Sequence, residues 1–372
     1  MEPSGPECIH YRRRCAHAPA PGRARIRSLS CLFSNFDQLA PKGWTGRLRV
    51  AGLFLAPPVL ASCSGIQSTL DPAGEEAGQV ATLFWAMTIG GALIWVGVVG
   101  LSLYASLWKR RSVSDKAAGR LIFWAGVLFP ISVLTALLSY ALWLMPSLRP
   151  FADSERAALR IEVVGQQFWW HVVYRHPDGA HVVSANEIRL PVGERVEFTL
   201  RSVDMIHSFW IPALGGKMDL IPGRANRLSL RATRAGTYRG QCAEFCGTSH
   251  ALMAFPAIAM EPADFEAWLD RRGRPSAGVD GGFGGRALFL REGCGECHGV
   301  TGTEADGTSG PDLSHVGSRL TIGAGLMPND AENLARFIAH SSSIKPGSKM
   351  PSYLGLTREE RDEIAAWLKG LQ

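Results

Sequence analysis

The chain has 372 residues, which is long enough for two or three domains. It is 46% hydrophobic and carries a formal net charge of +6. The whole charge excess lies in residues 1–62, where nine basic residues stand against three acidic ones. The remaining chain is formally neutral, which excludes a broad basic surface for nucleic acid. The unevenly placed apolar residues indicate a membrane protein instead.

Residues 1–62 predict an export signal or extension that is removed. Arg47 and Arg49 precede a short apolar run that is too short to span a bilayer. The tetrapeptide "LASC" resembles the lipobox of bacterial lipoproteins, in which Cys63 becomes the lipidated first residue. The alternative is an ordinary signal cleaved elsewhere, with Cys63 a free thiol. Residues 1–40, rich in Arg, Pro and Ala, are assigned no function.

Residues 63–150 predict a transmembrane hairpin with helices at about 80–108 and 121–145. Each run has the 20 or so apolar residues that a spanning helix needs, and Pro130 predicts a kink in the second. The basic loop between them is expected in the cytoplasm of a bacterial inner membrane, with all later residues on the outer, periplasmic face. The alternative, two buried helices of a soluble protein, fits the charged loop poorly.

The rest of the chain predicts two soluble domains. Residues 155–272 contain short β-branched and aromatic runs separated by Gly/Pro turns, which favours an all-β sandwich or barrel. Residues 273–283 form a Gly-rich polar stretch that predicts a flexible linker. Residues 284–372 are expected to be all-α, with a capping box at Thr357 and Glu360 before the last helix.

The spacing C-x3-C-x3-H-x2-M, made by Cys242, Cys246, His250 and Met253, predicts a metal site. A mononuclear blue-copper site needs one cysteine, whereas two thiolates can bridge two copper ions, each with one histidine and one weak ligand. A second histidine is then required, and His207 is the best candidate. A disulfide is the first alternative, but it leaves His250 and Met253 unexplained. Zinc, the second, has little use for methionine.

The stretches "VDMIHSFWIPALGGKMDLIPGRANRLSL" and "GTYRGQCAEFCGTSHALMAFPAI" resemble the copper signature of subunit II of the haem-copper cytochrome c oxidases. The resemblance covers roughly residues 78–270 and implies a cupredoxin fold. It also implies that the carboxylate of Glu244 faces a magnesium site shared with subunit I. The implied ligands of the two copper ions are the side chains of His207, Cys242, Cys246, His250 and Met253 and the backbone carbonyl of Glu244.

Two positions depart from that family's pattern. Gln167, Phe168, Trp169 and Trp170 stand where the family usually has Gln-Trp-Tyr-Trp. Phe168 therefore replaces the tryptophan linked with electron transfer from soluble cytochrome c, and Phe168 and Trp169 are the candidate residues where electrons enter. The family's glutamate at the start of the second helix is missing from residues 120–124.

A second redox centre is predicted by the "CGECH" motif. Cys294 and Cys297 would form the two haem thioethers, and His298 would be an axial ligand. The stretch "GPDLSHVGSR" resembles the haem-packing loop of class I cytochromes c, and Met350 is the candidate second axial ligand. A zinc knuckle is the alternative, but no second Cys/His pair follows.

Together these features predict subunit II of a caa3-type terminal oxidase. It would pass electrons from a soluble or membrane cytochrome c through haem c and a dinuclear copper centre to subunit I. Dioxygen would be reduced to water with proton translocation, and subunit III would be a further partner. One alternative is the electron-transfer subunit of a copper-containing nitric-oxide reductase. Another is a copper-delivery protein, which would hold no haem.

Overall fold

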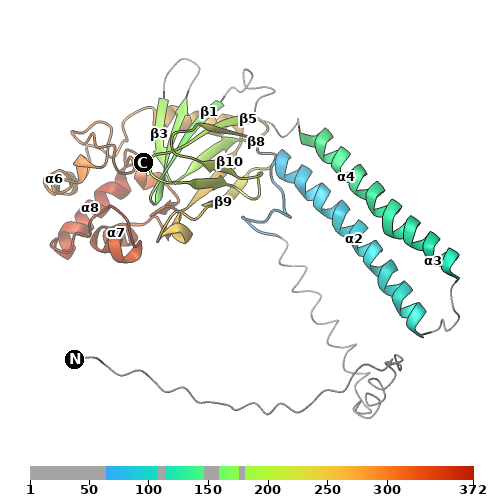
Figure 1. Cartoon of the computed structure of the whole chain (residues 1–372). Coiled ribbons are helices and arrows are strands. Elements are labelled where there is room, and N and C mark those ends of the chain that lie inside the picture. Colours follow the sequence, from blue (N-terminus) through green and yellow to red (C-terminus); the bar gives the residue numbers. More distant parts are fainter. Residues whose placement is uncertain (1–63, 108–113, 146–158, 176–180) are drawn as a thin grey trace, which may run out of the picture. The chain divides into compact units, whose positions relative to one another are not determined.

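The computed structural model describes residues 64–107, 114–145, 159–175 and 181–372. The predicted signal, Cys63 and the loop residues 108–113 lie outside these ranges. Residues 61–372 form one compact unit, in which helices come first, then the strands of the β domain, then a mainly helical region that begins with α5 (Pro262–Arg272) (Figure 1). We call residues 159–272 the β domain and residues 273–372 the C-terminal domain.

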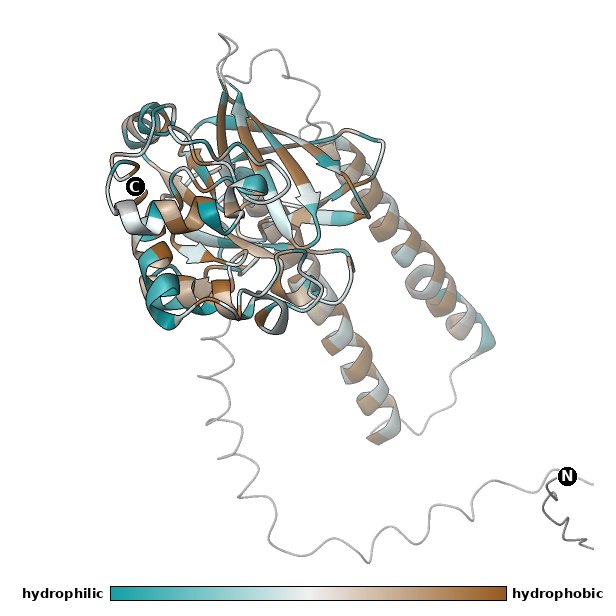
Figure 2. Ribbon diagram, turned by 90° about the vertical axis from the view of Figure 1, so that its left-hand side faces the viewer, coloured by the Kyte–Doolittle hydropathy of each residue, from teal (hydrophilic) through white to brown (hydrophobic). Residues whose placement is uncertain are grey.

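Two helical stretches are long and apolar enough to cross a membrane by length and composition, Glu75–Leu107 (α2) and Asp115–Leu144. Hydrophobic colour covers much of both in Figure 2. The second stretch consists of α3 (Asp115–Leu121), a π-helical segment η2 (Ile122–Leu128) and α4 (Phe129–Leu144).

Both stretches begin earlier than predicted, the second at Asp115 and not at residue 121, and the second is also irregular before its proline. Helix α2 begins at Glu75, five residues earlier than expected, because its first turn packs on the β domain. The disturbance expected at Pro130 takes the form of the π-helical segment directly before it. The wider turn lets Phe129 N bond to Trp124 O, which accommodates the proline ring and its missing N–H.

The β domain is a sandwich of two five-stranded sheets, as the sequence predicts. One sheet has the strand order β3-β2-β1-β5-β8 and the other β4-β10-β9-β6-β7. The pairs β1/β5 and β4/β10 are parallel. The strands are β1 (Leu159–Gln166), β2 (Trp169–Arg175), β3 (His181–Ala185), β4 (Ile188–Pro191), β5 (Arg195–Ser202), β6 (His207–Trp210), β7 (Met218–Leu220), β8 (Asn226–Arg231), β9 (Gly236–Cys242) and β10 (Ala254–Met260).

Aromatic side chains fill the space between the two sheets. Trp170, Phe198, Phe209 and Phe255 are fully buried, and the Phe209 and Phe255 rings stack with centroids 5.0 Å apart. Burying each such ring contributes about 1.5–3 kcal/mol. Phe209 also pairs in register with Cys242 on β9, so the core fixes the position of β6 relative to β9.

Residues 64–74, which we call the N-terminal strap, run along the β domain into α2. Arg239 N bonds to Ile66 O (2.9 Å), and Ala73 N bonds to Ala213 O (2.7 Å). Glu76, in the first turn of α2, is buried, and its carboxylate accepts a 2.6 Å bond from Arg195. A carboxylate at a helix N-terminus also interacts favourably with the helix dipole. The start of α2 is therefore held by contacts with the β domain.

The C-terminal domain is helical, as predicted. Its helices are α6 (Phe283–Arg291), α7 (Ala331–Ile344) and α8 (Arg358–Gly370), and a short hairpin is formed by β11 (Thr321–Ile322) and β12 (Met327–Pro328). The predicted capping box of Thr357 and Glu360 begins α8. The rings of Phe289 and Trp367 meet at 5.1 Å between α6 and α8.

The glycine-rich stretch between the two domains is packed, where the sequence predicts a flexible linker. Helix α5 (Pro262–Arg272) ends the β domain, and Ser276 and Val279 beyond it are buried. A Cβ built on Gly278 would lie 2.0 Å from Gly370 O. Glycine is therefore needed here for close backbone approach to the end of α8, and composition alone suggested a free coil.

Candidate metal centres

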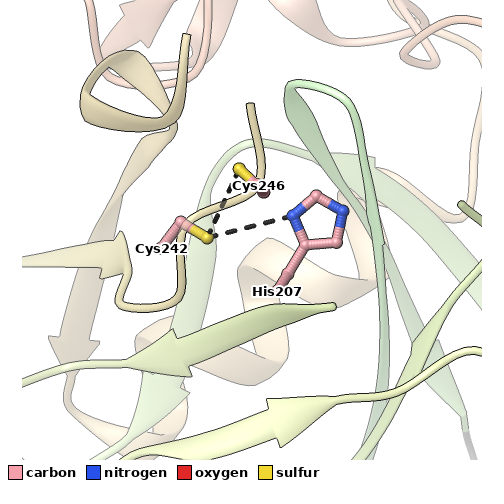
Figure 3. Close-up of side chains that lie close together, drawn as sticks. All are labelled: His207, Cys242 and Cys246. Carbon is pink, nitrogen blue, oxygen red and sulfur yellow. Dashed lines mark hydrogen bonds between the residues drawn. The ribbon is translucent and has the colours of Figure 1, made fainter. Parts of the chain in front are cut away.

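Strands β6 and β9 bring the first two candidate ligands together. His207 is the first residue of β6 and is fully buried, and Cys242 is the last residue of β9. Their side chains point toward one another and toward Cys246 (Figure 3). The ligand-atom positions of these three residues all lie within 4.8 Å of one another.

The other candidates lie on the loop between β9 and β10, residues 242–253, which we call the ligand loop. His250 Nδ1 lies 3.7 Å and Met253 Sδ 3.8 Å from Cys246 Sγ. The Cys242 and Cys246 sulfurs are 3.8 Å apart, far beyond the roughly 2.05 Å of a disulfide. The disulfide alternative therefore does not describe this structure.

The second half of the site surrounds Cys242. His207 Nδ1 lies 3.9 Å and the Glu244 carbonyl oxygen 3.2 Å from Cys242 Sγ. Two groups of donors thus share a pair of sulfurs, and each group has one imidazole and one weak ligand. Thiolate, imidazole and thioether donors suit copper, so the residues present fit the predicted metal.

Hydrogen bonds between the candidate ligands shift their pKa values strongly. The hydrogen bond from Cys246 lowers the pKa of Cys242 to about 3, against the opposing effect of burial. The same contact raises the pKa of Cys246. Burial lowers the pKa of His207, but hydrogen bonds to Cys242 and Asp204 outweigh it, so the net shift is upward. The contact between the two sulfurs therefore favours the thiolate of Cys242, which is the form that binds a metal.

Two positioning residues were missed by the sequence reasoning. Asp204 Oδ1 lies 2.9 Å from His207 Nε2, which leaves Nδ1 to face Cys242. Gln167 N donates to Asp204 Oδ2 (2.7 Å), and Gln167 Nε2 donates to Cys246 O (2.7 Å). Such outer partners orient metal ligands. The only sequence signal was the position of Asp204, three residues before His207.

The carboxylate of Glu244 lies beside Lys217. It lies 3.8 Å from Lys217 Nζ, and both side chains are about half exposed. Phe245, next along the ligand loop, is 76% exposed. This part of the ligand loop is therefore open for contact outside the chain.

Phe168 and Trp169 are buried, whereas residues that receive electrons directly from an external donor would be exposed on the surface. Phe168 is 4% and Trp169 9% exposed. A Cβ built on Gly247 would lie 3.1 Å from the Phe168 ring, and one built on Gly347 would lie 3.2 Å from it. The ring is therefore held between the ligand loop and the C-terminal domain.

The predicted haem-binding residues lie in the C-terminal domain. His298 Nδ1 bonds to Pro311 O at 2.7 Å, which leaves Nε2 free to act as a ligand. Burial is the main cause that lowers the pKa of His298, which favours the neutral imidazole that a metal ligand must be. A Cβ on Gly310 would lie 2.7 Å from the imidazole, so only glycine fits beside it.

Met350 and the two cysteines fit the same predicted group. Met350, Cys294 and Tyr353 pack on the hydrophobic core of this domain, and Cys297 is exposed. Ser341 donates to Met350 O at 2.9 Å, which fixes the segment that carries Met350. Two thiols, one neutral histidine and one methionine are the residue types that hold a c-type haem.

A buried carboxylate joins the two domains. Glu187 is 4% exposed; its Oε2 accepts a 2.8 Å bond from Leu320 N, and its Oε1 accepts bonds of 3.0 and 3.1 Å from Arg189. Arg319 is buried nearby. Burial lowers the pKa of Arg319, and the charges of Asp312 and Glu187 act in the opposite direction.

Further bonds cross between the domains at the ligand loop and at α5. Ser249 Oγ donates to Pro346 O at 2.6 Å, and Ala254 N bonds to Ala324 O at 3.0 Å. Arg272, whose pKa is lowered to about 10 mainly by burial, bonds to His315 O at 3.2 Å. The C-terminal domain is thus docked on the β domain through buried polar contacts.

This fold and these sites define a membrane protein that joins a copper-binding β domain to a cytochrome c domain. Residues 176–260 match the family described as cytochrome c oxidase subunit II, periplasmic domain, and residues 284–372 match the family described as cytochrome c. The chain belongs to the cytochrome c oxidase subunit 2 family. It is therefore the electron-transfer subunit of an oxidase, with other oxidase subunits and a cytochrome c donor as partners.

Individual relatives cover nearly the whole chain. Cytochrome c oxidase subunit 2 of Alkalihalophilus pseudofirmus is 32% identical over 347 residues, covering 89% of this chain and 99% of the relative. The subunit 2 of Bacillus subtilis is 31% identical, covering 86% and 96%. Among solved structures, the periplasmic domain of subunit II from Bradyrhizobium japonicum is 31% identical, covers 32% of this chain and 94% of that one, and has a TM-score of 0.29.

Proposed function

We propose that the β domain holds a dinuclear copper centre and that electrons reach it from a haem c in the C-terminal domain. From the copper pair they would go to subunit I, where dioxygen is reduced to water with proton translocation. The observation that carries this proposal is the pair of sulfurs shared by two donor groups. The proposed copper ligands are His207, Cys242, Cys246, His250, Met253 and the carbonyl of Glu244.

When bound, the metals supply the one-electron chemistry, and the protein supplies their positions and surroundings. Asp204 holds His207 with Nδ1 toward the sulfurs. Gln167 ties the backbone of Cys246 to the turn between β1 and β2. In the C-terminal domain, Cys294 and Cys297 would hold the haem by thioether bonds. His298 and Met350 would be its axial ligands.

Replacing Cys246 with serine tests the dinuclear centre. One bridging sulfur is lost, so the mixed-valent pair should give way to, at most, a mononuclear copper signal. Electron paramagnetic resonance of the purified subunit should show the multi-line spectrum of two equivalent coppers only in the wild type. The wild-type subunit, purified and loaded with copper in the same way, is the matched control. A C246S variant with the wild-type spectrum would overturn the proposal.

We also propose that Cys63 is the lipidated first residue of the mature chain. The motif "LASC" supports this, as does the position of Cys63 in the sequence directly before the N-terminal strap. Mass spectrometry of the membrane-bound subunit should find diacylglycerol on Cys63 and no peptide from residues 1–62. Recovery of an upstream peptide from the mature protein would contradict it.

The remaining proposals concern the surroundings of the subunit. We place the protein in a bacterial inner membrane with two membrane passes, soluble domains on the periplasmic side, and subunits I and III as neighbours.

The half-exposed carboxylate of Glu244 is the proposed contribution to a magnesium site shared with subunit I. Manganese bound in place of magnesium in the assembled oxidase would report that site by its paramagnetic signal. Loss of the signal in E244Q would support it, and an unchanged signal would contradict it.

A further inference from the structure

Lys345 is a buried lysine of the C-terminal domain that the proposed function does not use. It follows the last residue of α7 and is 3% exposed. Its Nζ donates to Gly323 O at 2.5 Å, which is an uncharged partner. Lys349, four residues later in the same loop, is exposed. Lys345 is therefore a buried lysine whose hydrogen-bond partner at Gly323 carries no negative charge, unlike a lysine on the surface.

The segments on both sides of the Lys345 side chain contact the ligand loop. At its backbone, the next residue, Pro346, accepts the 2.6 Å bond from Ser249, the neighbour of His250. At its ammonium end, Gly323 precedes Ala324, whose carbonyl accepts the bond from Ala254 N. Ala254 directly follows Met253 in the chain.

These two contacts bracket the part of the ligand loop that carries His250 and Met253. Lys345 connects the two segments that make these contacts, so its side chain lies close to the ligand loop. The long aliphatic stem of Lys345 spans from one to the other, and its charged end is held away from water.

The electrostatics of Lys345 agree with this position. Burial lowers its pKa to about 7, and the charge of Cys246 acts in the opposite direction. A buried ammonium with a neutral hydrogen-bond partner is poorly compensated. It therefore interacts strongly with negative charge nearby, because water screens the interaction less than at a surface.

We propose that Lys345 is a positioning charge for electron transfer, a buried cation of the C-terminal domain that stabilises the reduced state of the copper site in the β domain. Reduction adds one negative charge to the copper site, and a fixed cation nearby favours that change. The electron comes from the donor that the established activity already supplies. This inference rests on the proposed function, since it needs copper in the ligand loop.

The test compares midpoint potentials in the full-length subunit, assembled in the oxidase, by spectroelectrochemical titration at pH 6. At this pH an amine with a pKa of about 7 is mostly charged. K345M removes the charge and keeps the length of the side chain. We expect the copper midpoint potential to fall by about 59 mV, which corresponds to a tenfold shift in a one-electron equilibrium. K345R, which keeps the charge, should restore most of the wild-type potential.

Lys349 supplies the matched control. K349M makes the same change of charge at an exposed place in the same loop, so its effect should be small and should vanish in 1 M salt, where the Debye length is about 3 Å. The shift in K345M should persist in that salt and should exceed any shift of the haem.

Each remaining outcome has a distinct meaning. Wild-type potential in K345M, or equal shifts in K345M and K349M, would overturn the tuning role. Loss of copper in K345M alone would show a structural role and would overturn it too. Absence of copper from the wild-type subunit would instead contradict the proposed function itself.

Discussion

A chain that ends at Gly273 is expected to keep its copper spectrum and to oxidise a soluble cytochrome at least about 100-fold more slowly than the full chain, the scale of gain from tethering. In the full chain the donor haem would be docked beside the copper site, whereas the shortened chain depends on collision. Gly273 is the proper end point because Ser276 and Val279 are buried in the packing of the C-terminal domain.

The order of reduction in the full chain provides the companion measurement. Stopped-flow mixing with reduced donor should show the haem band changing before the copper band, because Phe168 and Trp169 are buried rather than displayed to a donor. The copper spectrum of the shortened chain is the control for its folding. Equal turnover by the shortened chain, or copper reduced first in the full chain, would mean that electrons do not enter at the haem.

Replacing Glu187 with alanine is expected to destabilise the soluble region by about 3–5 kcal/mol, the usual cost of removing one partner of a buried ion pair. The change leaves Arg189 without its carboxylate partner and Leu320 N without its acceptor. It also removes the negative charge that compensates buried Arg319. For a region of this size the midpoint of thermal unfolding should fall by on the order of 10 °C.

The matched control for E187A is E304A, which removes a salt bridge to Arg286 with a side chain 74% exposed. Exposed pairs contribute about 0–1 kcal/mol, so E304A should move the unfolding midpoint very little. Equal shifts in the two variants would show that the buried contact between the domains adds nothing beyond an ordinary surface pair.

The local parts of both sites could be predicted because their residues are close in sequence. Four candidate side-chain ligands and the Glu244 carbonyl lie in residues 242–253, and three haem-binding residues lie within five positions. Residues on a short loop cannot lie far apart in space. Their types and order in the sequence are therefore enough to predict which metal or cofactor they bind. His207 was found differently, from the need for a second imidazole, and β6 places it 3.9 Å from Cys242.

Contacts that depend on packing could not be predicted in the same way. Glu187 and Leu320 are far apart in sequence, and nothing near either residue indicates that they meet. The glycine-rich stretch was expected to be a free coil because composition does not distinguish flexibility from close backbone packing. Lys345 and Lys349 look equivalent in sequence, and only the fold buries one of them.

The N-terminal strap limits how the β domain can turn above the membrane. Ile66 is three positions after Cys63, so an anchor at Cys63 would lie within about 10 Å of the strap's contact with β9. Helix α2 leaves the same domain at Glu75, where the Glu76 carboxylate is bonded to Arg195. A body attached at two points can rotate only about the line that joins them. The ligand loop, with exposed Phe245, would therefore move relative to the neighbouring subunit only by rotation about that line.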